Sequence, residues 1–327
     1  MFSGKDILKS IKSNILPNVI DEAHVNLASQ WGKIEMREDM NIAPSYLRAQ
    51  VQATTKAPTL AMTASAKLSG KPCEIEQIKE MCSIQFSHTN VITISPVLHN
   101  HIYVNLKKPP SSYGFYGKNC YTLTPQKVGS LHVLWRLYLK QFVRDIKDGK
   151  LPKRAIIYVK RMEDLIELDD FLTSELGHLD IVRDKKMCPW VTNYSDIGPV
   201  TANDIRERTA QEKSSIYLYI STSVMLFGLN IKDISIIIMF SPFNSLNSIL
   251  QAGGRAGRRQ ASGERKKCVI YTLYNGTDLR KNSNVESSVR EFCQERGCLK
   301  EKMSSYFAHH EFTREDILWC CSSCGFP

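Results

Sequence analysis

Two arginines in the carboxyl-terminal half of the chain have the type and spacing to bind phosphate. The segment QAGGRAGRR begins at Gln251 and places Arg255 and Arg258 among glycines and alanines. Small residues let the backbone approach a partner closely, and a guanidinium can bind phosphate oxygens through two parallel hydrogen bonds. The segment predicts a phosphate-binding turn; the simpler alternative is a basic loop on an ordinary α/β domain.

Two acids follow an apolar run near the amino terminus, in the sequence VIDEAH from Val19 to His24. If that run is a parallel strand, Asp21 and Glu22 lie at the carboxyl edge of a sheet, where α/β folds bind ligands. In a nucleotide site, Asp21 would hold Mg²⁺ and Glu22 would orient or activate the attacking water. The alternative is a solvated acidic turn.

A second strand, Thr59–Met62, leads into the small hydroxyl residues of TASA. The side chains of Thr63 and Ser65 can hydrogen-bond to the acids of the first strand. We expect them to couple the state of a bound nucleotide to the neighbouring domain.

Cysteines are concentrated near the carboxyl terminus, at Cys293, Cys298, Cys320, Cys321 and Cys324. The C-x-x-C spacing of Cys321 and Cys324 is typical of a zinc knuckle, because tetrahedral Zn²⁺ favours thiolates at that spacing. Free buried thiols are the alternative. A disulfide framework is not expected in a chain of this kind.

Apolar runs of two kinds alternate along the chain. The short runs Arg154–Val159, Tyr217–Ile220 and Ile234–Phe240 are rich in β-branched residues and predict strands buried on both faces. Amphipathic stretches predict helices over Glu74–Met81, Val128–Ile146, Leu165–Leu176 and the short segment Asn244–Leu250. This alternation predicts an α/β fold built on parallel sheets.

Composition bounds the kind of protein. A length of 327 residues favours about two domains, and 43% hydrophobic with 23% charged residues is ordinary for a globular protein. The net charge of +10 favours a polyanionic partner. Lysines interrupt any signal-peptide pattern near Met1, and no apolar run is long enough for a transmembrane helix. We therefore expect a soluble intracellular protein without a membrane partner.

Taken together, DEAH, the following SQWG, TASA and QAGGRAGRR resemble the RecQ family of superfamily 2 DNA helicases. The resemblance runs from just before DEAH to the last cysteines. It implies two RecA-like lobes, the first incomplete, followed by a small helical zinc-binding subdomain. It also implies ATP-dependent 3′–5′ unwinding of DNA at junctions of single strand and duplex, in repair, recombination or replication in the nucleus. The protein partners stay unknown.

The same resemblance assigns roles to residues. Nucleotide contacts fall to Asp21, His24, Gly228, Asn230 and Gln251. Nucleic-acid contacts fall to Trp31, Arg37, Thr222 and Arg259. A tryptophan such as Trp31 suits base stacking, although a core position is the alternative. Arg255 and Arg258 would reach the γ-phosphate as arginine fingers.

The resemblance also implies a domain division. Residues 1–110 would form the partial first lobe, ending after the strand His101–Val104, residues 111–280 the second lobe, and residues 281–327 the zinc subdomain. The implied cofactors are ATP, Mg²⁺ and Zn²⁺. The zinc ligands would be Cys298, Cys320, Cys321 and Cys324, with Cys293, His309 or His310 as substitutes for one of them.

The sequence departs from the family pattern in several places. Two extra residues separate His24 from SQWG, and Asn193–Asp196 stands where the family has H-x-G. No G-x-x-x-x-G-K-[ST] phosphate loop occurs, so the chain resembles a helicase truncated within its first motor domain. We expect these residues alone to hydrolyse ATP poorly. The competing hypothesis is a catalytically inactive module that binds nucleic acid.

Overall fold

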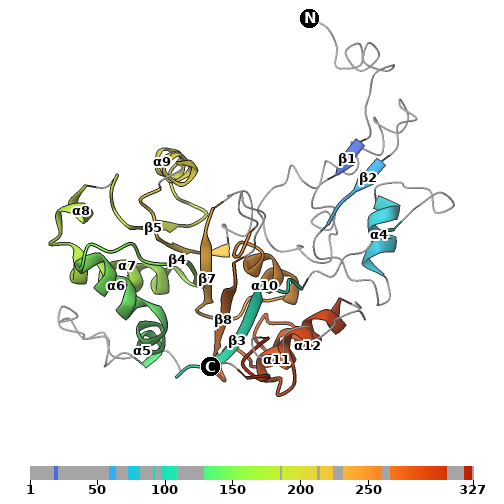
Figure 1. The fold of residues 1–327 in the computed structure, drawn as a ribbon. Coiled ribbons are helices and arrows are strands. Elements are labelled where there is room, and N and C mark those ends of the chain that lie inside the picture. Colours follow the sequence, from blue (N-terminus) through green and yellow to red (C-terminus); the bar gives the residue numbers. More distant parts are fainter. Residues whose placement is uncertain are drawn as a thin grey trace, which may run out of the picture. The chain divides into compact units, whose positions relative to one another are not determined.

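The computed structural model describes residues 18–20, 59–63, 73–81, 91–92, 97–109, 129–184, 186–211, 214–223, 231–258, 266–307 and 320–325. The chain divides into two compact units (Figure 1). The smaller unit comprises Met1–Pro96 with Ser304–Phe312, and the larger comprises Val97–Met303 with Thr313–Pro327.

Two short parallel strands and a helix are described in the smaller unit. The first strand, β1, spans Asn18–Ile20. β1 pairs in parallel with β2 (Thr59–Ala61), and Ile20 lies opposite Ala61. The predicted strands before DEAH and TASA are therefore neighbours. The predicted helix is confirmed as α4 (Glu74–Met81).

A six-stranded sheet forms the larger unit. In chain order its strands are β3 (His101–Lys107), β4 (Arg154–Tyr158), β5 (Trp190–Asn193), β6 (Leu218–Ser221), β7 (Ile234–Met239) and β8 (Cys268–Tyr274). Their order across the sheet is β3-β8-β7-β4-β6-β5, and every neighbouring pair is parallel. All six carboxyl ends consequently share one edge. The predicted strands near 154, 217 and 234 are confirmed.

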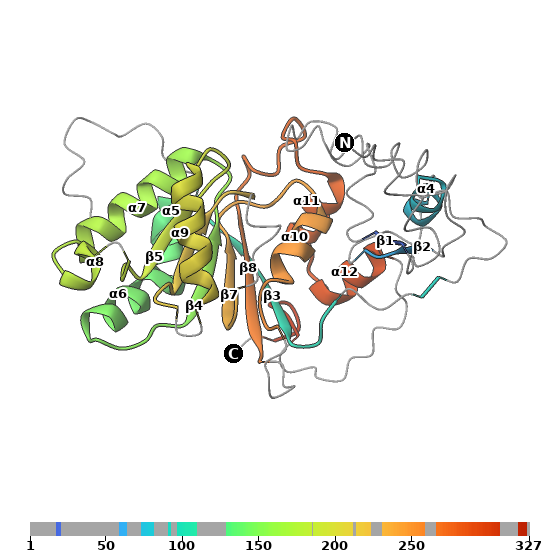
Figure 2. The ribbon, with the colours of Figure 1, turned by 90° about the horizontal axis from the view of Figure 1, so that it is seen from above.

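Helices cover both faces of this sheet. The described helices that follow β3 along the chain are α5 (Gly129–Leu134), α6 (Lys140–Lys147), α7 (Met162–Leu176), α8 (Asp180–Arg183), α9 (Pro199–Ala210), α10 (Leu246–Gly253), α11 (Ser287–Gln294) and α12 (Leu299–Tyr306). A π-helical turn, Trp135–Leu139, joins α5 to α6. In Figure 2, α6 and α7 lie on one side of the sheet and α10 and α11 on the other.

Side chains that alternate along β8 show the two layers. Leu273 belongs to the core that Phe142 of α6 and Leu172 of α7 share with β4 and β6. Ile270, of opposite parity, points to the other face and contacts the backbone of α10 at Gly253. The central strands are buried on both sides, which explains why they are continuous apolar runs.

One strand joins a different sheet from the one expected. The strand beginning at His101 was predicted to end the first lobe, yet β3 pairs with β8 along its whole length, from His101 opposite Cys268 to Lys107 opposite Tyr274. This pairing buries Ile102, Tyr103 and Val104 in the larger unit. β3 therefore belongs to the larger unit, whereas the predicted division at residue 110 places it in the first lobe. Local sequence shows that a strand forms but not which sheet it joins.

The predicted α/β class with parallel sheets is confirmed. Across the described part of the chain, every helix is too short or too polar to span a lipid bilayer.

Candidate functional site

α10 carries the predicted phosphate-binding segment, and its ends follow from residue type. Ser245 precedes the helix, and its hydroxyl accepts a hydrogen bond from the backbone N–H of Ser248 (3.2 Å), which caps the first turn. The helix ends at Gly253. Beyond it the Arg255 N–H donates to the carbonyl of Ala252 (3.1 Å), a tighter turn than that of an α-helix.

Gly257 fixes the path of the chain between the two arginines. Its φ of +60° is a left-handed conformation that other residues rarely adopt, and its N–H donates to the carbonyl of Ile234 at the start of β7 (3.0 Å). A Cβ at this position would lie 2.2 Å from Nδ2 of Asn100 and 2.9 Å from Sγ of Cys268. Only glycine fits, so the turn is locked against the amino ends of β7 and β8.

The two guanidinium groups interact electrostatically with each other and with Tyr158. Arg258 is exposed overall, and its Nε donates to the carbonyl of Gly254 (3.3 Å). Desolvation of the guanidinium and the charge of Arg255 lower the pKa of Arg258, while Tyr158 opposes this shift. Arginine stays protonated near neutral pH, so the turn presents paired positive charges that favour an anion.

Thr222 lies at the other edge of the sheet. It follows β6, and its N–H donates to the carbonyl of Asn193 at the end of β5 (3.1 Å). Gln251 is half-buried on α10 in the same segment as Arg255 and Arg258. The structure thus brings Gln251 and the arginines together and places Thr222 separately at the carboxyl edge. Thr63 is half-buried, two residues beyond β2.

The remaining predicted nucleotide and nucleic-acid residues lie outside the described residues. They are Asp21, Glu22, His24, Trp31, Arg37, Ser65, Gly228, Asn230 and Arg259.

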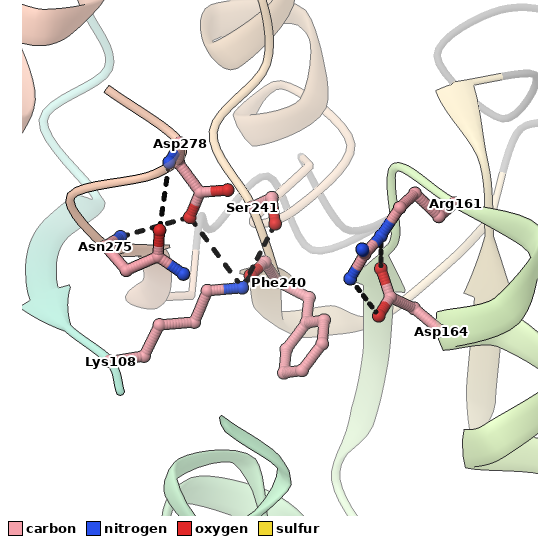
Figure 3. Close-up of polar contacts among 7 residues, drawn as sticks. All are labelled: Lys108, Arg161, Asp164, Phe240, Ser241, Asn275 and Asp278. Atoms are coloured by element: carbon pink, nitrogen blue, oxygen red, sulfur yellow. Dashed lines mark hydrogen bonds and ion pairs between the residues drawn. The ribbon is translucent and has the colours of Figure 1, made fainter. Parts of the chain in front are cut away.

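Sequence reasoning missed a cluster of charged groups at the carboxyl edge, centred on Lys108 (Figure 3). The Lys108 side chain is 1% exposed. Its ammonium donates to the carbonyl of Phe240 and to the hydroxyl of Ser241 (3.0 Å), and it lies 4.1 Å from the centre of the Phe240 ring. Burial lowers the pKa of Lys108, which the nearby acid Asp278 partly offsets.

Asp278 is held in place by a reciprocal pair of hydrogen bonds. The N–H of Asn275 donates to the Asp278 carboxylate (3.0 Å), and the N–H of Asp278 donates to the Asn275 side chain (2.9 Å). The carboxylate then lies 3.9 Å from the Lys108 ammonium. The end of β8 is thereby joined to the ends of β3 and β7.

Exposed cations follow β4 at the same edge. Lys160 donates to the side chain of Asn244 (2.8 Å). Partial desolvation of its ammonium lowers the pKa of Lys160, and the negative charge of Asp278 partly offsets this shift. Arg161 forms two hydrogen bonds, 2.9 and 3.1 Å long, with the buried carboxylate of Asp164. Lys160 and Arg161 can bind phosphate groups. The signal in the sequence was their position just after a predicted strand.

Four cysteines converge, as the zinc interpretation requires. The Sγ atoms of Cys298, Cys320, Cys321 and Cys324 all lie within 4.8 Å of one another. Tetrahedral zinc with bonds of about 2.3 Å needs sulfur atoms roughly 3.8 Å apart, so the set fits the ion. Cys293 is not part of this group, and His309 and His310 lie outside the described residues.

Local contacts shift the pKa values of the clustered thiols in opposite directions. Hydrogen bonds from Cys298 and Cys320, together with the N–H of Leu299 (3.4 Å), hold the pKa of Cys321 below its ordinary value. Hydrogen bonding raises the pKa of Cys320, and burial raises the pKa of Cys324. A thiolate is the form that binds metal. The segment is attached to the open edge of β3, because the Ser322 N–H donates to the Tyr103 carbonyl (2.9 Å).

Comparison with known proteins identifies the domain that contains α10. Residues 138–260 match the helicase conserved C-terminal domain. This match includes Thr222, Gln251, Arg255 and Arg258, whereas the cysteine cluster lies beyond it. No curated protein sequence matches the chain.

Solved structures share the fold at low sequence identity. A variant of S. cerevisiae Dbp5 bound to RNA and ADP BeF3 has a TM-score of 0.52 and 16% identity, with 95% of this chain and 63% of that chain covered. The DUF1998 helicase MrfA bound to DNA has a TM-score of 0.51 and 14% identity, with coverages of 80% and 30%. The chain therefore spans less than two thirds of either relative. Residues 138–260 thus match the helicase conserved C-terminal domain, and the chain has a RecA-like parallel α/β fold.

Proposed function

We propose that this chain contributes the carboxyl-terminal lobe of an ATP-dependent nucleic-acid helicase of RecQ type, which moves 3′ to 5′ on DNA. The observation that carries the proposal is the turn of Arg255 and Arg258, locked by Gly257 within the helicase domain. Neighbouring guanidinium groups stabilise the negative charge that develops during phosphoryl transfer. Asp21 and Glu22 would bind Mg²⁺ and activate water on the first lobe.

The residues at the carboxyl edge of the sheet and the cysteine cluster also receive roles in this proposal. Thr222, Lys160 and Arg161 would contact the phosphate backbone at the carboxyl edge of the sheet. Zinc held by the four cysteines would fix the start of α12 to β3. The proposed organisation keeps three parts, with β3 assigned to the second lobe. Repair, recombination or replication in the nucleus is the setting that the RecQ resemblance supports.

ATP hydrolysis by the purified chain, with and without single-stranded DNA, tests the proposal. We expect the chain to hydrolyse ATP slowly, DNA to stimulate that slow turnover, and the substitutions Arg255→Ala and Glu22→Gln each to lower kcat by roughly 10²- to 10³-fold. Arg183→Ala, on exposed α8, is the matched control and should leave turnover unchanged. Turnover that is insensitive to Arg255→Ala would reject the proposed role, and a parallel series with RNA decides between the two polymers.

A second candidate is a nucleic-acid-binding module that does not hydrolyse ATP. The exposed cations Lys160 and Arg161 at the carboxyl edge favour it, because they provide binding without the arginine turn. Salt-dependent DNA binding without ATP turnover would support this reading. DNA-stimulated turnover that Glu22→Gln abolishes would reject it.

A further inference from the structure

The side chain of Asn100, distant in sequence, hydrogen-bonds to the backbone of the arginine turn, the segment from Arg255 to Arg258, and to the backbone of Lys266. The amide of Asn100 donates to the carbonyl of Gly257 (3.0 Å) and to the carbonyl of Lys266 (2.9 Å). Gly257 precedes Arg258, and Lys266 lies where the chain returns toward β8. A carboxamide has two N–H donors, and Asn100 uses both, one for the carbonyl of Gly257 and one for the carbonyl of Lys266.

The next residue supports the same turn. Nε2 of His101 lies 3.2 Å from the carbonyl of Ala256, and because a carbonyl can only accept, Nε2 carries the proton. Two consecutive side chains therefore bind two consecutive carbonyls between Arg255 and Arg258. The missing Cβ of Gly257 is what allows Asn100 to come this close.

Asn100 and His101, which we call the brace, are themselves held by hydrogen bonds to neighbouring elements. The carbonyl of Asn100 accepts a hydrogen bond from the N–H of Cys268 (3.0 Å), and His101 begins β3, which pairs with β8. On the other side, the ammonium of Lys300 donates to the carbonyl of His99 (2.9 Å). Lys300 is buried and follows Cys298 by two residues, so the segment 99–101 links the cysteine cluster to the arginine turn.

We propose that Asn100 and His101 are positioning residues, which hold Arg255 and Arg258 in the geometry needed for phosphate. This inference rests on the proposed function for its catalytic consequence, whereas the brace is a property of the fold. The arginines act on charge that develops in the transition state. A turn freed from its brace keeps both guanidinium groups but no longer directs them.

Limited proteolysis of the full chain tests the brace without requiring activity. Trypsin cleaves after Lys266, which is exposed, but the carbonyl of the bond to be cut is held by Asn100. Cleavage therefore requires local opening. We expect Asn100→Ala to speed cleavage after Lys266 by about tenfold or more. The substitution removes the two hydrogen bonds that the Asn100 amide donates, so the locally open form that trypsin cleaves becomes more populated.

Asn105→Ala is the matched control. Asn105 lies on β3, five residues beyond Asn100, and also donates through its amide, but to the carbonyl of Phe292, away from the turn (2.6 Å). Its loss should leave cleavage after Lys266 unchanged. Equal rates for Asn100→Ala and the unmodified chain would overturn the proposal, as would an equal acceleration by Asn105→Ala.

Hydrogen exchange decides the matter if Asn100→Ala does not fold. In the unmodified chain the N–H groups of Gly257 and Cys268 should exchange slowly, because Gly257, whose carbonyl Asn100 binds, donates to the carbonyl of Ile234, and Cys268 donates to the carbonyl of Asn100. Exchange as fast as that of an unstructured peptide overturns the proposal.

Kinetics test the catalytic consequence separately. We expect Asn100→Ala to lower kcat by about tenfold with KM for ATP changed by less than about twofold. A rise in KM alone contradicts a positioning role. If the unmodified chain shows no turnover, the proposed function fails, while proteolysis still decides whether Asn100 braces the turn.

Discussion

Replacing Lys108 with methionine tests whether one buried charge holds the carboxyl edge together. The ammonium donates to the Phe240 carbonyl and the Ser241 hydroxyl and lies 3.9 Å from the Asp278 carboxylate. Hydrogen bonds from a charged donor contribute about 1.5–3 kcal/mol each. Methionine keeps the packing on Phe240 and removes the cost of burying an ammonium, which offsets part of that loss. We expect a net destabilisation of about 2–3 kcal/mol.

Urea unfolding, followed by both tryptophan fluorescence and circular dichroism, measures this change if the two transitions coincide. Lys150→Met is the matched control, because Lys150 forms a shorter ion pair with Asp148 (3.1 Å) but its side chain is 68% exposed. Exposed pairs contribute little, so the control should change the free energy of unfolding by less than about 0.5 kcal/mol. Equal effects of the two substitutions would refute the reasoning that burial, rather than ion-pair distance, sets the strength.

The lowered pKa of Lys108 adds a dependence on pH. Between the folded-state pKa and the higher pKa of an unfolded lysine, the unfolded chain binds more protons than the folded one. The stability of the unmodified protein relative to Lys108→Met should therefore increase as the pH rises through this range. A difference that decreases over the same range would show that the pKa is raised instead.

Three further predictions concern other parts of the larger unit. Gly257→Ala should destabilise it by about 2–4 kcal/mol in urea unfolding, since the new Cβ meets Asn100, whereas Gly198→Ala, with no atom within 4 Å of its Cβ, should stay within about 0.5 kcal/mol. Metal analysis should find about one zinc per chain, and Cys321→Ser should lose it and lower Tm; a metal-free, equally stable protein would reject the zinc site. Lys160→Ala should weaken DNA binding and reduce its salt slope by about 1, a change that Lys150→Ala should not produce.

Local patterns in the sequence were sufficient for several of the strands and helices, whereas β5, β8, α9 and α11 were not predicted. The strands β4, β6 and β7 coincide with apolar runs of β-branched residues, because a strand buried on both faces has no polar positions to interrupt it. The helix α10 followed from its amphipathic spacing, and the convergence of the four cysteines agrees with their spacing along the chain. The strands and the helix depend on neighbours in sequence, whereas the set of four cysteines was implied by the family resemblance.

Contacts across the sheet were not predictable in this way. Asn100 reaches Gly257 and Lys266 over separations of 157 and 166 residues, and Lys108 reaches Phe240 over 132. The position of β3 beside β8 produces all of these contacts. Which strand pairs with which depends on the packing of the whole sheet, so no local window contains that information.

The residue types thus determined that a turn with two arginines follows α10 and that four cysteines can hold a metal. Only the tertiary structure decided what holds that turn in place. Gly257 required a left-handed backbone, and the room left by its missing side chain was taken by Asn100, which immediately precedes a strand predicted to belong to the first lobe. The physical reason is that a parallel sheet brings distant strand ends together, and the chemistry of a site depends on which ends meet.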